Sequence, residues 1–234
     1  MADQALGLMA QNLTKRFTGS GSDVLALDGI NLEVPKGGFT SVIGPSGCGK
    51  STLLRILSDL IEPTTGQAEV NGKSPREARE AREFGVVFQA PNLLPWRTVL
   101  KNVTLHLQVM KVDRADRAKT ATDMLELVGL PGFERHHPWQ LSGGMQQRVA
   151  IARALSMQPS VLFMDEPFGA LDEITRDRLN LELIRIWAQT SATIMFITHS
   201  LTEAVFMSTQ VAAMSDRPGR ITEVIDIDLP AERT

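Results

Sequence analysis

The chain has 234 residues, and its hydrophobic content of 43% is ample for one large domain or for a domain with a subdomain. The formal net charge of −3 gives no electrostatic reason to expect nucleic acid or an anionic membrane as the main partner. A single cysteine excludes an intrachain disulfide, and no apolar run reaches the roughly 20 residues that span a bilayer. Because the first residues also lack the basic-then-apolar order of a secretion signal, we expect a globular protein of the cytoplasm.

Short apolar runs broken by turns fill the first part of the chain, and they predict β-structure. These runs cover residues 8–13, 24–27 and 30–34, with a loop at 18–22. Phe17 lies at the edge of the loop, and Val24 lies across it. The phenyl ring is either a face on which a nucleotide base stacks or an ordinary core aromatic, and the residues alone do not choose between these interpretations.

The most informative stretch is residues 44–51, which have the spacing G-x-x-x-x-G-K-[ST] of a phosphate-binding loop. The stretch follows a β-prone run at 39–43 and precedes a helix-prone run at 52–57, as a P-loop requires. Backbone N–H groups at a helix N-terminus converge on a phosphate, while Lys50 reaches the β- and γ-phosphate oxygens and Ser51 offers its hydroxyl to Mg²⁺. The predicted nucleotide-binding residues are Gly44, Pro45, Ser46, Gly47, Cys48, Gly49, Lys50, Ser51 and Thr52.

Cys48 is the only cysteine of the chain, and it lies inside this loop. We interpret it as a small residue that the loop tolerates rather than as a catalytic thiol, because no base is evident beside it. We expect the thiol to react with alkylating reagents in the free protein and to be protected by ATP.

A short β-prone run at 67–70 follows the P-loop helix and leads into Asn71-Gly72. This dipeptide is a strong signal for a β-hairpin turn. The next run, 75–83, is dense in Arg and Glu and predicts a solvated helix or loop.

A buried strand is predicted at 84–88, and it ends at Gln89. Residues 90–96 then contain two prolines and several large apolar side chains. Prolines predict a loop here, and apolar area in a loop makes this segment a candidate contact surface.

The segment Val103–Val109 supports two interpretations. Its apolar residues alternate, which favours a strand of period two. The family resemblance described below implies a helix instead. Residues 116–128 are a clearer amphipathic helix, which Gly129 closes.

Ser142, Gly143 and Gly144 precede a strongly helix-forming run at 145–155. A serine and two glycines at a helix N-terminus make either a second anion site or a plain glycine-rich cap. Taken in isolation, the pattern favours the plain cap.

Residues 161–164 predict a buried parallel strand that delivers Asp165 and Glu166 at its carboxyl end. Ligands bind at this end of the strands in open α/β sheets. Asp165 suits water-mediated coordination of Mg²⁺, and Glu166 is placed to orient an attacking water. We expect Pro167 to hold Glu166 in an extended segment, because proline disfavours the helical region for the residue before it.

A further buried strand at 193–198 presents His199 at its end. A lone histidine is usually structural. Here it is expected to share a sheet edge with a carboxylate and a phosphate loop, which favours a place in the site.

Six motifs occur in the order found in the nucleotide-binding subunits of ATP-binding cassette (ABC) transporters, and the chain resembles that family over nearly its whole length. They are the P-loop Gly44–Ser51, the Q-loop residue Gln89, the signature Leu141-Ser142-Gly143-Gly144-Met145, the Walker B segment Val161–Asp165 with Glu166, the D-loop Ala170-Leu171-Asp172 and the H-loop residue His199. Two positions depart from the family pattern, since Met145 replaces the commonest glutamine and Phe17 replaces a frequent tyrosine. We expect little effect, because the serine and the glycine amides supply the phosphate contacts and a phenyl ring can still stack.

The resemblance implies an α/β fold. Its P-loop NTPase core is RecA-like, with a mixed or parallel sheet flanked by helices, and it carries an N-terminal antiparallel β part and an inserted helical subdomain. The implied division gives residues 1–89 and 159–234 to the core and residues 90–158 to the subdomain.

The resemblance also implies an ATPase that uses ATP and Mg²⁺. Its implied catalytic residues are Lys50, Glu166 and His199, and its implied metal-site residues are Ser51, Gln89 and Asp165. The remaining implied nucleotide contacts are Phe17, Val24, Gln89, Ser142, Gly143, Gly144 and Met145.

Residues 88–99 and 217–221 further resemble importer subunits for nitrate, sulfonate, taurine and similar small solutes. The resemblance implies a head-to-tail ATP-dependent dimer, peripheral on the cytoplasmic face of the plasma membrane. It implies that Pro91–Thr98 contacts a membrane permease, that a solute-binding protein acts indirectly, and that nucleic acid is not a partner. An exporter subunit and a soluble cassette ATPase remain alternatives, although the latter usually shows a second cassette, a long coiled coil or a basic face. The transported solute is not encoded in this chain.

Overall fold

A computed structural model describes residues 5–19 and 23–229, so the loop expected at 18–22 lies partly outside the described residues. The chain forms two compact units. The first unit is built from three segments, namely the chain up to Phe84, the segment Ser160–Glu166, and the chain from Ser191 onward. The second unit is built from Gly85–Pro159 and Pro167–Thr190. The expected division assigned all of 159–234 to the core, whereas residues 167–190 group with the second unit.

The first unit contains a three-stranded antiparallel sheet with the order β2-β1-β4. Its strands are β1 (Leu6–Phe17), β2 (Val24–Pro35) and β4 (Thr65–Val70). In β2, buried Ile30, Leu32 and Val34 alternate with more exposed neighbours, as expected for a sheet with one face on a core. The short runs predicted from the sequence therefore belong to two long strands.

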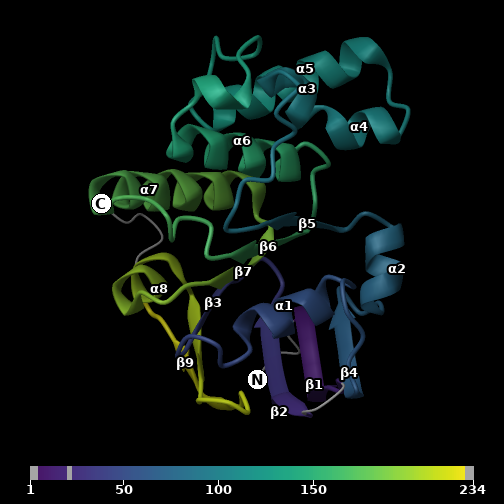
Figure 1. Ribbon diagram of the computed structural model, residues 1–234, viewed down its shortest axis with the longest axis vertical. Coiled ribbons are helices and arrows are strands. Elements are labelled where there is room, and N and C mark those ends of the chain that lie inside the picture. Colours follow the sequence, from purple (N-terminus) through teal and green to yellow (C-terminus); the bar gives the residue numbers. More distant parts are fainter. Residues whose placement is uncertain (1–4, 20–22, 230–234) are drawn as a thin grey trace. The chain divides into compact units, whose positions relative to one another are not determined.

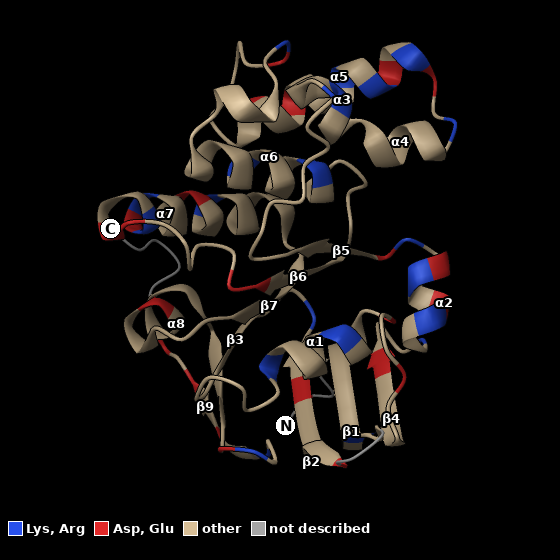
Figure 2. Ribbon diagram, in the orientation of Figure 1, with Lys and Arg blue, Asp and Glu red and all other residues tan. Residues whose placement is uncertain are grey.

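The first unit also contains a largely parallel sheet, within which the order is β6-β7-β3-β8-β9 (Figure 1). The strands are β3 (Phe39–Ile43), β6 (Val161–Asp165), β7 (Thr193–Ile197), β8 (Gln210–Met214) and β9 (Ile221–Asp226), of which only β9 pairs antiparallel. Every residue of β7 is buried, and β3 and β7 carry no charged side chain (Figure 2). Such continuous apolar runs are typical of parallel strands covered on both faces.

Helices α1 (Lys50–Leu57) and α8 (Leu201–Met207) belong to this unit, together with the short helix α2 (Pro75–Glu80). Ser74 caps α2 in a capping box with Glu77, which confirms a helix in the predicted 75–83 segment.

The hairpin prediction at Asn71-Gly72 is correct for the turn and wrong for the second strand. The turn itself forms, because Val70 and Lys73 exchange two backbone hydrogen bonds of 2.8 and 3.0 Å. It leads into α2, however, and β4 pairs with β1 rather than with a following strand. The signal was local, whereas strand pairing is decided by the rest of the chain.

Strand β5 (Phe84–Val87) carries the chain from the first unit into the second. The second unit is helical, with α3 (Val99–Val103), α4 (Leu105–Val109), α5 (Arg114–Leu127), a 3₁₀ turn η1 (Pro138–Gln140), α6 (Gly143–Leu155) and α7 (Glu173–Thr190). No helix among the described residues has both the length and the apolar character needed to traverse a bilayer.

The strand interpretation of Val103–Val109 is wrong, because the segment is helical in α3 and α4. Val99, Val103 and Leu107 are all buried, and their spacing of four residues puts them on one helical face. Val109, which completed the alternating pattern, is 75% exposed. The alternation was therefore a coincidence of spacing.

Candidate active site

The P-loop joins β3 to α1 in the first unit, as predicted from the residues on either side of it. Gly49 immediately precedes α1 with a φ of 113°. A Cβ atom there would lie 2.6 Å from the Leu27 side chain and 2.9 Å from the carbonyl oxygen of Ala26. Only glycine fits this position, because both the backbone angle and the close approach exclude a side chain.

The Lys50 side chain is 6% exposed and turns back into the loop. Its Nζ donates hydrogen bonds to the carbonyl oxygens of Gly44 and Pro45, at 2.7 and 3.0 Å. The ammonium group is thus held within the turn that the loop backbone makes. A P-loop lysine acts on phosphate from this position.

Ser51 and Asp165 meet at the carboxyl edge of the parallel sheet. Ser51 Oγ donates a hydrogen bond of 2.9 Å to Asp165 Oδ1. Burial raises the pKa of Asp165 above its usual value, and the nearby charge of Glu166 adds to this, while the bond from Ser51 acts in the opposite direction. A hydroxyl and a carboxylate oxygen side by side are ligands that a hard cation such as Mg²⁺ prefers, so the pair fits the expected metal.

Glu166 and His199 face each other at the same edge, with His199 Nδ1 at 3.7 Å from Glu166 Oε2. The side chains are 27% and 56% exposed, so both are open to a reactant. The expectation of an extended Glu166 is wrong, because its φ of 44° lies in the left-handed region. Pro167 disfavours the right-handed helical region for Glu166, but it does not by itself select the extended one. The Glu166 N–H must also reach the carbonyl of Ile197, at 3.0 Å, and the left-handed conformation meets both demands.

Phe17 pairs with Val24 at the ends of β1 and β2. The phenyl ring is 42% exposed, which excludes the core interpretation. The ammonium of Lys15 lies 5.1 Å from the ring centroid, a cation–π distance. A role in base stacking stays a prediction.

Cys48 is 1% exposed, so the expectation of a thiol open to reagents in the free protein is wrong. Gly219 packs against it so closely that a Cβ on Gly219 would lie 2.2 Å from the Cys48 carbonyl oxygen. Arg217 contacts the same loop, with Nη2 donating to the Gly47 carbonyl at 3.1 Å. The sequence did not reveal this support, because the two segments are far apart in the chain and no spacing links them.

The signature residues lie in the second unit, at the start of α6. Ser142 is its N-cap, and Ser142 Oγ accepts a hydrogen bond of 3.3 Å from the Met145 N–H. Gly144 is buried, and a Cβ there would lie 3.1 Å from the Thr175 side chain, whereas Ser142 and Gly143 are exposed. The structure thus contains the cap, and anion binding by the exposed residues stays a prediction.

Gln89 also belongs to the second unit, where it is exposed just after β5. Helix α6 holds the backbone around it at two points. Gln147 Nε2 donates to the Phe88 carbonyl at 3.1 Å, and Arg153 donates to the carbonyls of Pro91 and Asn92, each at 2.8 Å. Sequence reasoning missed both side chains, which look like ordinary polar residues of a helix.

Asn102 is a third residue that sequence reasoning missed. Its side chain is 0% exposed and lies under the loop at 94–98. Its Oδ1 accepts from the Leu94 N–H at 2.8 Å, and its Nδ2 lies 3.1 Å from each of the carbonyl oxygens of Leu94, Arg97 and Thr98. The shape of the loop after Gln89 therefore depends on one buried amide.

A phosphate loop with its lysine folded inward, next to a serine–aspartate pair and an accessible glutamate, defines the class of P-loop nucleotide hydrolases. The family model described as ABC transporter matches residues 27–169, more than half of the chain. The chain therefore belongs to the ABC transporter family, and it is an ATPase of that family.

Known relatives agree with this assignment. The chain is 51% identical over 229 residues to an uncharacterized ABC transporter ATP-binding protein of Methanocaldococcus jannaschii, a match that covers 97% of this chain and 85% of that protein. It is 46% identical to a taurine import ATP-binding protein of Rhizobium johnstonii, over 89% of this chain and 79% of that protein. It is 42% identical to an aliphatic sulfonates import ATP-binding protein of Bacillus cereus, over 95% of this chain and 86% of that protein.

A solved structure extends the similarity to the fold. The dimeric structure of a post-hydrolysis state of an ATP-binding cassette, bound to ADP and Pi, is 31% identical with a TM-score of 0.82. The match covers 95% of this chain and 100% of that chain. The α/β fold with its N-terminal antiparallel sheet is thus confirmed as that of an ABC cassette.

Proposed function

We propose that this chain hydrolyses Mg·ATP to energise import of a small solute, of the taurine, sulfonate or nitrate kind, through a separate permease. The observation that carries the catalytic part is the sheet edge at which Ser51 contacts Asp165 and Glu166 faces His199. The relatives named as taurine and aliphatic sulfonates import proteins support the transport part.

Each residue at this edge has a role that its chemistry permits. Lys50 exchanges its carbonyl partners for phosphate oxygens and offsets the charge that develops on them. Glu166 accepts a proton from the attacking water or orients it, and His199 contacts the γ-phosphate from the other side. Mg²⁺, held by Ser51 and Asp165, would neutralise phosphate charge.

The nucleotide also needs a second copy of the chain in this proposal. The exposed Ser142 and Gly143, together with Gly144 and Met145 at the start of α6, form the N-terminal end of a helix, which attracts anions. A γ-phosphate bound to the P-loop of one copy would be shared with this end of the other. Two copies would then close head to tail on ATP and separate after hydrolysis.

The permease contact is assigned to Pro91–Thr98. Trp96 is 71% exposed, which a lone subunit has little reason to maintain, while Leu93 and Leu94 are half-buried. A subunit docked on a permease in this way sits on the cytoplasmic face of the plasma membrane, and a solute-binding protein would act on it only through the permease.

Glu166→Gln tests the catalytic assignment. The amide keeps the shape of the side chain but cannot accept a proton, so Mg·ATP binding should persist while turnover falls by at least about a hundredfold. Size-exclusion chromatography should then detect an ATP-dependent dimer. The matched control is Glu223→Gln, an equivalent change at an exposed position of β9. Turnover near the wild-type rate in the Glu166 variant would disprove the role, and failure of any membrane protein to co-purify would favour a cassette ATPase without a transporter.

A further inference from the structure

The backbone on both sides of His199 is held by hydrogen bonds of its two chain neighbours. The Thr198 N–H donates to the Val42 carbonyl in β3 at 3.3 Å, and the Ser200 N–H donates to Thr198 Oγ1 at 3.0 Å. The Ser200 N–H belongs to the peptide plane that follows the Cα atom of His199. Its bond therefore fixes the backbone on the carboxyl side of His199, and with it the direction in which the imidazole leaves the chain.

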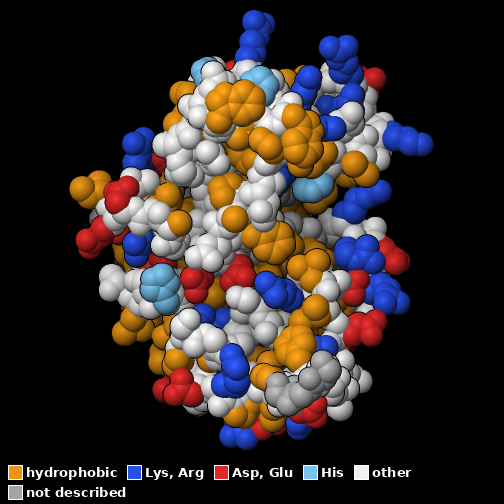
Figure 3. Space-filling view, viewed as in Figure 1, with side chains coloured by type: hydrophobic (Ala, Val, Ile, Leu, Met, Phe, Trp, Pro, Cys, Tyr) orange, Lys and Arg blue, Asp and Glu red, His pale blue; other side chains and the backbone are white. Residues whose placement is uncertain are grey.

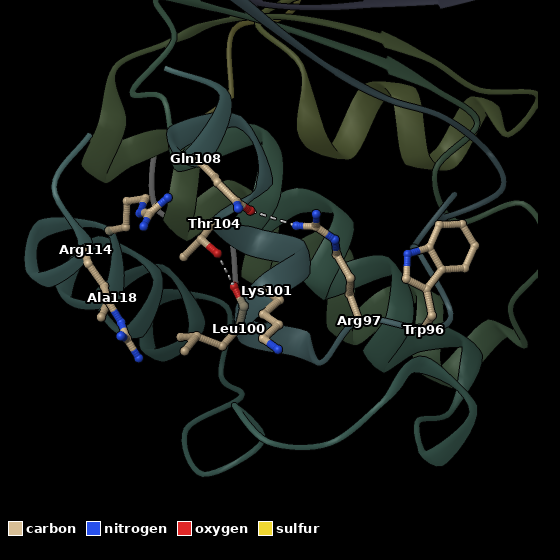
Figure 4. Close-up of a pocket in the computed structure, with 9 residues that line it drawn as sticks. Trp96, Arg97, Leu100, Lys101, Thr104, Gln108, Arg114 and Ala118 are labelled. Carbon is tan, nitrogen blue, oxygen red and sulfur yellow. Dashed lines mark hydrogen bonds between the residues drawn. The ribbon is translucent and has the colours of Figure 1, made fainter. Parts of the chain in front are cut away.

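The Thr198 hydroxyl accepts this bond while it donates its own hydrogen to the Glu203 carboxylate in α8. Threonine hydroxyls in helices often donate to a backbone carbonyl instead, as Thr104 does to Leu100 at 2.9 Å (Figure 4). A carboxylate can only accept, so it fixes the direction of the hydroxyl hydrogen and leaves the lone pairs of the oxygen for the Ser200 N–H. Glu203 thus orients the group that holds the backbone at the sheet edge.

Glu203 is buried, which is unfavourable for a carboxylate. Acidic side chains normally lie at the surface, where Figure 3 shows them in red, but Glu203 is 7% exposed and is the only Asp or Glu that the structure describes as buried. No ion pair in the described part of the chain includes it, and its Oε1 atom has no hydrogen-bond partner there. A buried carboxylate without a basic partner costs stability, so its presence here indicates a function rather than packing.

Helix capping does not account for this carboxylate. Ser200 and Glu203 have the S-x-x-E spacing of a capping box, in which the glutamate side chain accepts from the N–H of the cap residue. Only half of the box forms. Ser200 Oγ accepts from the Glu203 N–H at 3.3 Å, whereas the Ser200 N–H is bound by Thr198. The cap at the start of α8 and the bond between Thr198 and Glu203 can therefore be removed separately.

We propose that Glu203 is a positioning residue for His199. The carboxylate orients the Thr198 hydroxyl, and the hydroxyl holds the backbone after His199. The imidazole is thereby kept facing Glu166, with Nδ1 at 3.7 Å from Glu166 Oε2. This role rests on the proposed function, in which His199 contacts the γ-phosphate. Glu203 itself touches no reactant.

Two substitutions of Glu203 in the purified chain test this role. Glu203→Met keeps the length of the side chain but removes the acceptor, so the turnover rate for Mg·ATP should fall at least about tenfold while the Kd for ATP stays within about twofold. Glu203→Gln should keep the turnover rate within about threefold, because its amide oxygen can still accept from Thr198. Thr198→Val breaks the same link at its other end, and the double variant with Glu203→Met should be no slower than either single variant.

Two controls separate positioning from stability. Ser200→Ala removes the helix cap but keeps the backbone N–H that Thr198 binds, so the melting temperature should fall while the turnover rate of the folded protein stays near that of the wild type. Thr104→Val removes a hydroxyl that donates to a backbone carbonyl, and it should leave the turnover rate unchanged. If Ser200→Ala slows turnover as much as Glu203→Met does, Glu203 serves the cap and the inference is wrong.

The imidazole of His199 gives a direct readout of its position. The chain has four histidines, so the NMR signal of the His199 ring can be identified by its loss in His199→Ala. This signal should shift or broaden in Glu203→Met and stay in place in Ser200→Ala. An unchanged signal in Glu203→Met, or a Glu203→Gln variant as slow as Glu203→Met, would overturn the inference. If His199→Ala hydrolyses ATP at the wild-type rate, the role of His199 in the proposed function fails, and the ring signal alone then decides whether Glu203 positions it.

Discussion

The buried amide of Asn102 offers a direct test of how the loop at 94–98 is held. Asn102→Ala removes the side-chain oxygen that accepts from the Leu94 N–H and the amide nitrogen that donates to the nearby carbonyls. Because that nitrogen has two hydrogens for three carbonyl oxygens, the substitution removes three hydrogen bonds in all. At about 1 kcal/mol per hydrogen bond, the free energy of unfolding should fall by about 3 kcal/mol. The carbonyls belong to half-buried residues that water can reach, so we add no further penalty.

The loss is large enough to measure in two ways. For a chain of this size, about 3 kcal/mol corresponds to a decrease in melting temperature of roughly 6–12 °C. Hydrogen exchange at the Leu94 amide, which donates to the side-chain Oδ1 of Asn102, should accelerate by about a hundredfold. Asn102→Asp should be no better than alanine, because a carboxylate oxygen would then face the carbonyls that the amide nitrogen now contacts.

The control and the refuting result follow from the same geometry. Lys101→Ala changes an exposed neighbour in α3 and should alter the unfolding free energy by less than about 0.5 kcal/mol. A decrease below about 1 kcal/mol for Asn102→Ala, with unchanged exchange at Leu94, would show that the loop keeps its shape without the amide.

Three further predictions concern the first unit. Cys48, which is buried, should react slowly with maleimide in the native protein with or without ATP, and quickly only in denaturant; rapid native labelling would contradict its burial. Burial raises the folded-state pKa of Asp165, so the charged carboxylate destabilises the fold above that pKa. Asp165→Asn should therefore raise the melting temperature at neutral pH while it abolishes Mg·ATP hydrolysis. An unchanged or lower melting temperature would refute this. Arg217→Ala removes a donor to the Gly47 carbonyl, so ATP binding should weaken several-fold in a fluorescence titration while the melting temperature changes little. Unaltered affinity would show that Arg217 does not support the P-loop.

The parts of the fold that follow from local patterns were predictable. The run at 39–43, the glycine spacing and the helix-forming run after Lys50 each agree with the strand, loop and helix that form, because apolar runs and glycines act locally. The positions of Asp165 and His199 at one sheet edge followed from parallel strand order. The Asn71-Gly72 turn shows the limit, since the turn formed but its predicted strand partner did not.

The features that were not predictable depend on contacts between distant segments. Cys48 is buried because Gly219 folds against it, and no pattern near Cys48 indicates this. Asn102 and Arg153 look like solvated polar residues of helices until the loop they bind is in place. Glu166 was expected to be extended because Pro167 restricts it, but a backbone bond across the sheet selected another conformation.

The left-handed backbone at Glu166 affects which substitutions at this position would stabilise the fold. A non-glycine residue in this region is strained by about 1 kcal/mol or more, and glycine would relieve that strain. The substitution that makes the fold more stable here is therefore one that removes the carboxylate from the site. Selection for heat resistance alone, without a demand for ATP turnover, would favour glycine here, and under the function proposed above such a protein would bind ATP but hydrolyse it very slowly.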